Sequence, residues 1–333
     1  MLKRLWGDGE ASRGPLSTPE ATTVESLPRP LMPSPTLTIG LPVYNAGPFL
    51  RDCLRSIFAQ SWSDWELVAA DDGSTDESLA ILESIDDQRV RLVGRGLHQG
   101  LGASLNVITT NARGRYIARM DADDMMHPSR LERQLRVLLE RPDLDGLGCG
   151  MVVLDKSLEP VGTKLNPVDH AAICADPLTG IRLAHATFVG RAEWFRRHPY
   201  NNDSYGCEEW ELLFSTFAKS RFANLPEPLY FYRELDSFTV SKYLRRQLRS
   251  SSFSWQHGRG QFRKARTAWH CGKRFGRGLL YASAGMCGIA ELLVRRRYVP
   301  VDAVSAKQLR STIQQIRSGS LPLCPAALPS HSP

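Results

Sequence analysis

The stretch Gly114-Arg-Tyr-Ile-Ala-Arg-Met-Asp-Ala-Asp-Asp124 places three carboxylates directly after a short apolar segment. The segment is expected to be a β-strand that ends in a turn at Asp121. Like charges this close repel each other, and burying them without a partner would cost free energy. Carboxylate oxygens suit Mg²⁺ or Mn²⁺, and Mg²⁺ is often held by one or two protein carboxylates together with substrate phosphates. Asp121, Asp123 and Asp124 are therefore candidate metal ligands, and the alternative is an acidic turn that caps the next helix.

A second acidic turn, Asp71-Asp-Gly-Ser-Thr-Asp76, follows the apolar run that begins at Trp65. The first apolar run of the chain, residues 37–43, breaks in the same way at Tyr44 and Asn45. Segments of helical spacing separate these runs at βαβ intervals, which predicts an α/β fold with a mostly parallel sheet flanked by helices. Because ligands of such sheets bind beyond the carboxyl ends of the strands, the two acidic turns and the Tyr44 turn should converge on one crevice.

The spacing also predicts the other elements. Strands are expected at residues 90–93, 147–154, 186–191 and 225–233, and helices at 49–60, 77–85, 100–110, 128–139 and from 208 onward. Residues 163–179 are expected to form a loop or lid.

The composition sets the outer limits. The chain has 333 residues, is 42% hydrophobic and carries a net charge of +7, with the basic excess after about residue 243.

Residues 1–36 are rich in Pro, Ser and Thr and predict a disordered leader. The first residues are not followed by an apolar run, so a secretory signal is not expected. Seven scattered cysteines without zinc-type spacing favour reduced thiols in a cytoplasmic protein.

Residues 241–333 are predicted to be a basic helical region that is disordered at its end. Within it, residues 278–294 form an apolar stretch flanked by Lys273-Arg274 and Arg295-Arg-Arg297. The stretch is short for a membrane span, and the flanking charges favour a helix lying on an anionic membrane surface. The alternative is a helix packed on the domain. No nucleic-acid recognition module is apparent, so nucleic acid is not an expected partner.

Two common phosphate-binding devices are absent from the sequence. Gly94, Gly96 and Gly100 do not have the G-x-G-x-x-G spacing of dinucleotide enzymes, and the chain has no Walker A loop. A diphosphate would then be held by a metal ion and side chains. This favours a nucleotide whose diphosphate departs in the reaction, and a sugar nucleotide is such a substrate.

The chain resembles family-2 glycosyltransferases of the GT-A fold in seven stretches, which follow the family's order between residue 37 and about residue 240. The stretches are Pro42-Val-Tyr-Asn-Ala, Val68-Ala-Ala-Asp-Asp-Gly-Ser-Thr-Asp, Gly114-Arg-Tyr-Ile-Ala-Arg-Met-Asp-Ala-Asp-Asp, Pro128-Ser-Arg-Leu-Glu-Arg-Gln, His185-Ala-Thr-Phe-Val-Gly-Arg, Glu208-Glu-Trp-Glu-Leu-Leu and Leu225-Pro-Glu-Pro-Leu-Tyr-Phe-Tyr-Arg.

The resemblance implies a GT-A domain over residues 37–240, with a nucleotide-binding half (37–125) and an acceptor half (126–240). It implies an inverting, metal-dependent transfer of a sugar from a nucleotide-diphosphate donor to a saccharide or lipid-linked acceptor, in surface polysaccharide or glycolipid synthesis. Asp121 and Asp123 would be the DxD pair, contacting the ribose and the metal, and Asp124 is the alternative ligand in place of one of them. The residues expected to bind the nucleotide sugar are Pro42, Tyr44, Asn45, Asp71, Asp72, Asp121 and Arg233, the last near the diphosphate.

Glu209 would take the place of the general base. The family usually has Glu-Asp where this chain has Glu208-Glu209, and the longer arm moves the carboxylate by about one C–C bond. Glu208 or Glu211 could be the base instead. The substitution also leaves open a non-catalytic relative that only binds a nucleotide sugar. His98 stands where the family often has Asn, and its role is open. His185 is expected to be structural.

Overall fold

The structure, a computed structural model, describes residues 34–94, 96, 98–204, 206–233 and 239–324. The predicted leader lies outside the described residues except for residues 34–36. The disorder predicted at the end of the chain also falls outside them.

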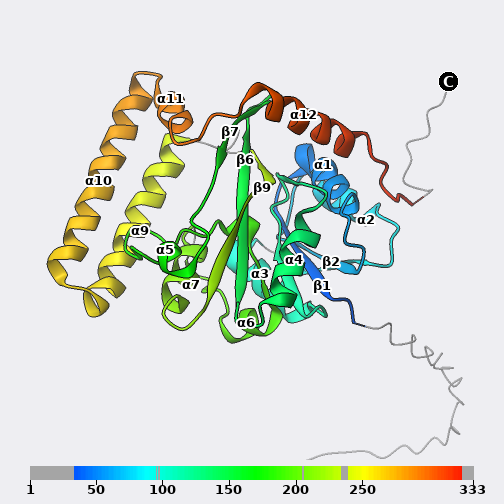
Figure 1. Cartoon of the computed structure of the whole chain (residues 1–333), viewed down its shortest axis with the longest axis horizontal. Helices are drawn as coiled ribbons and strands as arrows, with labels where there is room; N and C mark the ends of the chain where they lie inside the picture. The colour runs from blue at the N-terminus through cyan, green and yellow to red at the C-terminus, as the bar shows by residue number, and fades with distance from the viewer. Residues whose placement is uncertain (1–33, 95, 97, 205, 234–238, 325–333) are drawn as a thin grey trace, which may run out of the picture. The chain divides into compact units, whose positions relative to one another are not determined.

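The described residues form one nine-stranded sheet in the order β3-β2-β1-β4-β8-β6-β9-β5, with β7 paired to β6 (Figure 1). Parallel pairs join β3-β2-β1-β4 and β6 to β9, and the antiparallel pairs involve β5, β7 and β8. The predicted α/β class is confirmed. The strands are β1 Leu37–Val43, β2 Trp65–Asp71, β3 Val90–Val93, β4 Tyr116–Arg119, β5 Met125–Met126, β6 Gly146–Leu154, β7 Pro160–Lys164, β8 Val189–Arg191 and β9 Phe222–Tyr232.

Helices cover both faces of the sheet. Side chains of α1, α2 and α4 form one buried cluster with β1, and those of α3, α6 and α7 form a second cluster on the opposite face. The helices of this part of the chain are α1 Gly47–Phe58, α2 Ser78–Glu83, α3 Leu101–Asn111, α4 Arg130–Glu140, α5 His170–Ile173, α6 Ala192–Arg197 and α7 Glu208–Thr216, with a short 3₁₀ turn η1 at His185–Thr187.

The register of the parallel strands brings the polar turns to one edge of the sheet. Val43 of β1 lies opposite Asp71 of β2, and Gly40 lies opposite Arg119 of β4. β1 and β2 are buried along their whole length, which suits their continuous apolar sequences. The turns after β2, β1 and β4 are therefore neighbours, as the βαβ pattern predicts.

The second half of the fold differs in detail from the elements that the sequence predicts. The expected loop at 163–179 contains the end of β7 and the four-residue helix α5, whose N-cap Asp169 accepts from the Ala172 N–H. The expected strand at 186–191 is shortened, because its first residues form η1. The two-residue strand β5 and the six-residue helix α6 are too short to leave a periodic signal.

The chain continues in four described helices, α9 Val240–Gln261, α10 Lys264–Met286, α11 Ala290–Arg295 and α12 Ala303–Ser318. α9 and α10 lie side by side, and α12 runs over α1 (Figure 1). The apolar stretch 278–294 is not one helix, because α10 ends at Met286 and Gly288 takes a positive φ of 71° before α11. Among the described residues, every helix is too short or too polar to span a bilayer.

Candidate functional site: a carboxylate cluster beside an acidic helix start

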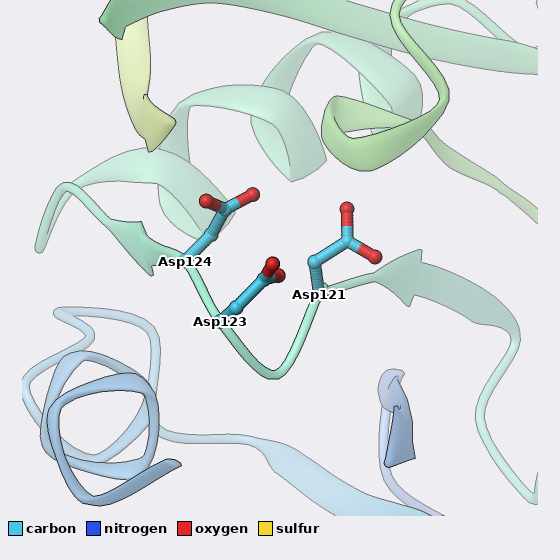
Figure 2. Close-up of side chains that lie close together, drawn as sticks. All are labelled: Asp121, Asp123 and Asp124. Carbon is cyan, nitrogen blue, oxygen red and sulfur yellow. The ribbon is translucent and has the colours of Figure 1, made fainter. Parts of the chain in front are cut away.

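The turn between β4 and β5 carries the three predicted metal ligands. Asp121, Asp123 and Asp124 project to the same side of this turn (Figure 2), and one oxygen from each lies within 4.8 Å of the others. Oxygen ligands on opposite sides of a bound Mg²⁺ are about 4 Å apart. One oxygen of the buried Asp124, Oδ2, has no hydrogen-bond partner among the described residues. These side chains fit a divalent cation.

Two carboxylates of the cluster have raised pKa values. Burial, and next the charge of Asp121, raise the pKa of Asp123 to about 6. Burial and the charges of Asp123 and Asp121 raise the pKa of Asp124 well above its usual range. A bound cation would stabilise the charged forms of Asp123 and Asp124, which burial and the neighbouring negative charges oppose.

Buried groups hold the first ligand in place. Arg119 forms an ion pair with Asp121, and the Tyr230 hydroxyl accepts from the Asp121 N–H at 3.2 Å. Burial opposes the charged form of Arg119, but Asp121, Tyr230 and Tyr200 together outweigh burial, so the pKa of the guanidinium is raised. Beneath the turn, the buried Arg130 donates to the Arg119 carbonyl at 2.9 Å and lies over the Tyr230 ring.

The first acidic turn, after β2, is hydrogen-bonded differently. Both oxygens of Asp72 accept backbone N–H groups of the loop before α3, from Gln99 at 2.8 Å and Gly100 at 2.9 Å. Asp71 accepts the N–H groups of Gly73 and Ser74 through Oδ2, while its buried Oδ1 has no partner among the described residues. Asp72 thus fixes a loop, and Asp71 retains an oxygen for a ligand.

The residues after β1 line the same edge. Asn45 accepts the Thr75 N–H at 2.8 Å, which ties the Tyr44 turn to the first acidic turn. Tyr44 is exposed and stacks on His98 with ring centroids 4.0 Å apart. His98 in turn lies 2.7 Å from Asp72. Pro42 is buried within β1 opposite Ala70, so it shapes the strand and offers no exposed surface.

Arg233 lies at the far end of β9, beside the carboxylate cluster. Its N–H donates to Asp124 Oδ1 at 2.8 Å, and its guanidinium lies 3.3 Å from Asp52 of α1. Asp52 also pairs with Arg55 of its own helix and, at 3.1 Å, with Arg317 of α12. The C-terminal helix thereby takes part in positioning Arg233, a link that the sequence does not reveal.

The three glutamates at the start of α7 have separate surroundings. Glu208 is 7% exposed and accepts the Gly206 N–H at 2.8 Å. Glu211 accepts from Ser204 and Asn201 in the preceding loop. Glu209 has a side chain that is 38% exposed and pairs with Arg246 of α9 at 3.1 Å. Glu208 and Glu211 therefore hold the loop before α7, whereas Glu209 faces Arg246 of α9.

His185 lies between the two halves of the site. Its Nδ1 is 3.8 Å from Glu209, and its Nε2 is 2.8 Å from the Tyr200 hydroxyl. Burial first, and the charge of Arg119 next, lower its pKa well below the usual range, while Asp121 opposes the shift. His185 is therefore neutral and buried near Glu209, and its Nδ1 has no hydrogen-bond partner among the described residues.

The sequence missed several residues that shape this site: Asp52, Arg119, Arg130, Tyr230, Arg246 and Arg317. Three of them, Arg119, Arg130 and Tyr230, lie inside quoted motifs. A charged residue in an otherwise apolar strand was the available signal for Arg119. Arg246 and Arg317 come from helices far along the chain and carry no such signal.

The acidic turns lie at the carboxyl edge of an α/β sheet, which is where such folds bind their ligands. The sequence model described as "Glycosyl transferase family 2" matches residues 38–165. The putative glycosyltransferase EpsE of Bacillus subtilis is 32% identical over 207 residues, covering 60% of this chain and 73% of EpsE. The putative teichuronic acid biosynthesis glycosyltransferase TuaG of the same organism is 34% identical over 109 residues, covering 32% and 43%.

The fold is also that of a solved glycosyltransferase. The mannosyltransferase PcManGT of Pyrobaculum calidifontis, solved with GDP-Man and Mn²⁺, superposes with a TM-score of 0.51 at 15% identity, covering 85% of each chain. The chain belongs to glycosyltransferase family 2 and is a glycosyltransferase of the GT-A fold. The predicted family is confirmed.

Proposed function

We propose that the protein is an inverting glycosyltransferase that uses Mg²⁺ or Mn²⁺ to transfer a sugar from a nucleotide-diphosphate donor to an acceptor hydroxyl. The observation that carries the proposal is the cluster of Asp121, Asp123 and Asp124 at the carboxyl end of β4. The Mn²⁺ and GDP-Man bound by PcManGT support the same kind of donor site. We also propose that the GT-A domain spans residues 37–240 and that its nucleotide-binding half ends near residue 125.

On the donor side, Asp71 and Tyr44 bind the nucleoside, with Asn45, Pro42 and Asp72 shaping the turns around it. A cavity of about 90 Å³ lined by Asp71, Asp72 and Gly96 adjoins these turns. Asp121, Asp123 and Asp124 would hold the cation, which when bound supplies positive charge for the departing diphosphate. Arg233, whose charge opposes the rise in the pKa of Asp123, adds a second positive charge near the cluster.

On the acceptor side, Glu209 accepts the proton of the attacking hydroxyl. A carboxylate within reach of the acceptor hydroxyl can act as its general base. Glu208 and Glu211 are engaged by the preceding loop, which supports Glu209 over its neighbours. Arg246 positions the Glu209 carboxylate.

The resemblance to TuaG supports a role in surface polysaccharide or glycolipid synthesis, with a saccharide or lipid-linked acceptor. We place the protein at the inner face of the plasma membrane, attached through α10. Its large apolar side chains Trp269, Leu279, Leu280 and Met286 are exposed, and Met286 is 84% exposed. At 100° per residue they lie opposite the buried Tyr281, with Lys273 at their border, which suits an anionic surface.

A screen of nucleotide sugars for nucleoside diphosphate release tests the proposal. We expect release from one donor that needs Mg²⁺ or Mn²⁺, stops with excess chelator and resumes when the ion is restored. The product's anomeric configuration, read by NMR, should be inverted relative to the donor. Donor binding without release or transfer, in the presence of metal and with cell-derived acceptors, would instead support a relative that only binds nucleotide sugars.

A further inference from the structure

A basic cavity of about 600 Å³ lies between the glycosyltransferase domain and helices α9 and α10. This volume is typical of a small-molecule site. Six Lys and Arg side chains line it, and none of its described lining residues is acidic: the six are Lys164, Arg246, Lys273, Arg274, Arg277 and Arg297. Walls of one charge sign concentrate the field inside a cavity and attract ions of the opposite sign.

Arg274 is built into this cavity. Its guanidinium donates to the Leu178 and Thr179 carbonyls at 2.8 and 3.1 Å and stacks on Trp210 at 4.0 Å. Burial lowers the pKa of Arg274 to about 10, and the nearby Arg277 and Arg246 act in the same direction. The fold therefore holds like charges together at a cost that a bound anion would offset.

The cavity also has aromatic walls, from Trp210, Tyr232 and Tyr243. Flat apolar rings beside polar groups are a suitable surface for the apolar face of a sugar ring. Cations and aromatic rings together fit a saccharide that carries an anionic group.

The cavity adjoins the proposed base. Arg246 lines it and donates to Glu209 at 3.1 Å, and Trp210 directly follows Glu209 in α7. Tyr232 precedes Arg233, which lies beside the carboxylate cluster. A ligand in this cavity is therefore next to Glu209 and one residue along the chain from Arg233.

We infer that this cavity is an acceptor subsite that binds a phosphate ester, so that the acceptor is a phosphorylated saccharide. The inference rests on the proposed glycosyltransferase function. Guanidinium groups match phosphate oxygens in pairs, and six cations exceed what one carboxylate would balance. In the transfer, the acceptor oxygen bonds to the anomeric carbon, and the bond from that carbon to the donor phosphate breaks. The hydroxyl proton passes to Glu209, and the electron pair leaves with the nucleoside diphosphate.

A charge-matched pair of double variants tests the site. Lys273→Gln/Arg277→Gln removes two cations from the cavity, and Lys264→Gln/Arg296→Gln removes two exposed cations of the same helical region outside it. Binding of glucose 1-phosphate and of uncharged methyl glucoside is measured by saturation-transfer NMR with chelator present, which keeps metal out of the donor site. We expect wild type and the outer variant to bind glucose 1-phosphate alike, and the cavity variant to bind about tenfold more weakly.

Equal affinity of the two double variants, or equal binding of methyl glucoside, would overturn the inference. So would inorganic phosphate binding as tightly as glucose 1-phosphate, since the cavity would then hold an anion without recognising a sugar. Two competitors separate the sources of the phosphate: a soluble oligo(glycerol phosphate), and vesicles carrying a polyprenyl diphosphate-linked saccharide. Displacement by one identifies the source, and displacement by neither counts against an acceptor site.

Donor turnover by the wild type distinguishes a failure of the acceptor inference from a failure of the proposed glycosyltransferase function. Metal-dependent nucleoside diphosphate release without glucose 1-phosphate binding would remove the phosphorylated acceptor and leave the glycosyltransferase function standing. Glucose 1-phosphate binding without release from any nucleotide sugar would remove both the proposed function and the acceptor role of the cavity.

Discussion

The two acidic turns of this protein have similar sequences and different chemistry. Both follow buried parallel strands at one edge of the sheet. In the first turn, Asp72 has both oxygens bonded to backbone N–H groups, so the carboxylate fastens a loop. In the second, Asp123 and Asp124 crowd Asp121, and burial raises their pKa values. Carboxylates whose oxygens are already bonded shape a site, and crowded carboxylates with unbonded oxygens are available to a cation.

The largest expected effect is at the second turn. Asp123→Ala should abolish detectable sugar transfer, because it removes one of the three clustered carboxylates proposed to hold the cation. The fold should survive, since Asp123 lies at a partly exposed turn and contributes nothing to the apolar core. Turnover on the donor found in the screen and circular dichroism measure the two effects. Near-normal transfer by this variant would mean that the cluster is not the cation site.

The next largest effect is at the start of α7. Glu209→Gln keeps the shape of the side chain and removes its basicity, so turnover should fall by roughly two to four orders of magnitude with little change in donor affinity. Glu208→Gln and Glu211→Gln should lose less, because both side chains serve the loop before α7. If Glu208→Gln is inactive and Glu209→Gln is near normal, the base lies one residue earlier.

The comparison of the turns predicts opposite effects on stability. Asp72→Asn loses the charge that accepts two backbone N–H groups, so the free energy of unfolding should fall by about 1–3 kcal/mol. Asp123→Asn removes like-charge repulsion and should leave stability in the absence of metal unchanged or raised. Urea denaturation with chelator measures both variants. A larger loss for Asp123→Asn would show that the second turn also holds the fold together.

The smallest expected effect concerns α10. Leu280→Ser/Met286→Ser reduces its exposed apolar surface and should weaken flotation with phosphatidylglycerol vesicles by about threefold or more. Leu139→Ser/Val304→Ser, two exposed apolar positions on α4 and α12, is the matched control. If the α10 variant changes the oligomeric state and not flotation, the face binds a second copy and the membrane proposal fails.

The sequence predicted the first half of the fold well, because β1 to β4 and α1 to α4 alternate with clear periodicity and end in polar turns. Clustered carboxylates after a strand made Asp121 and Asp123 candidates, and the family resemblance made Glu209 one. It could not predict the tertiary pairings: Arg317 reaches Asp52 across 265 positions, and Arg246 reaches Glu209 from α9. The split between α10 and α11 was also missed, because the apolar stretch runs on through Gly288.

The central claim is that the second acidic turn, and not the first, binds the divalent cation. Mn²⁺ binding followed by electron paramagnetic resonance, with and without a nucleoside diphosphate, tests it most directly. We predict that wild type and Asp72→Asn bind Mn²⁺ and hold it more tightly with the nucleotide, while Asp123→Ala shows neither behaviour. Mn²⁺ binding by Asp123→Ala as tight as that of wild type would contradict the claim, and so would its loss in Asp72→Asn with the fold retained.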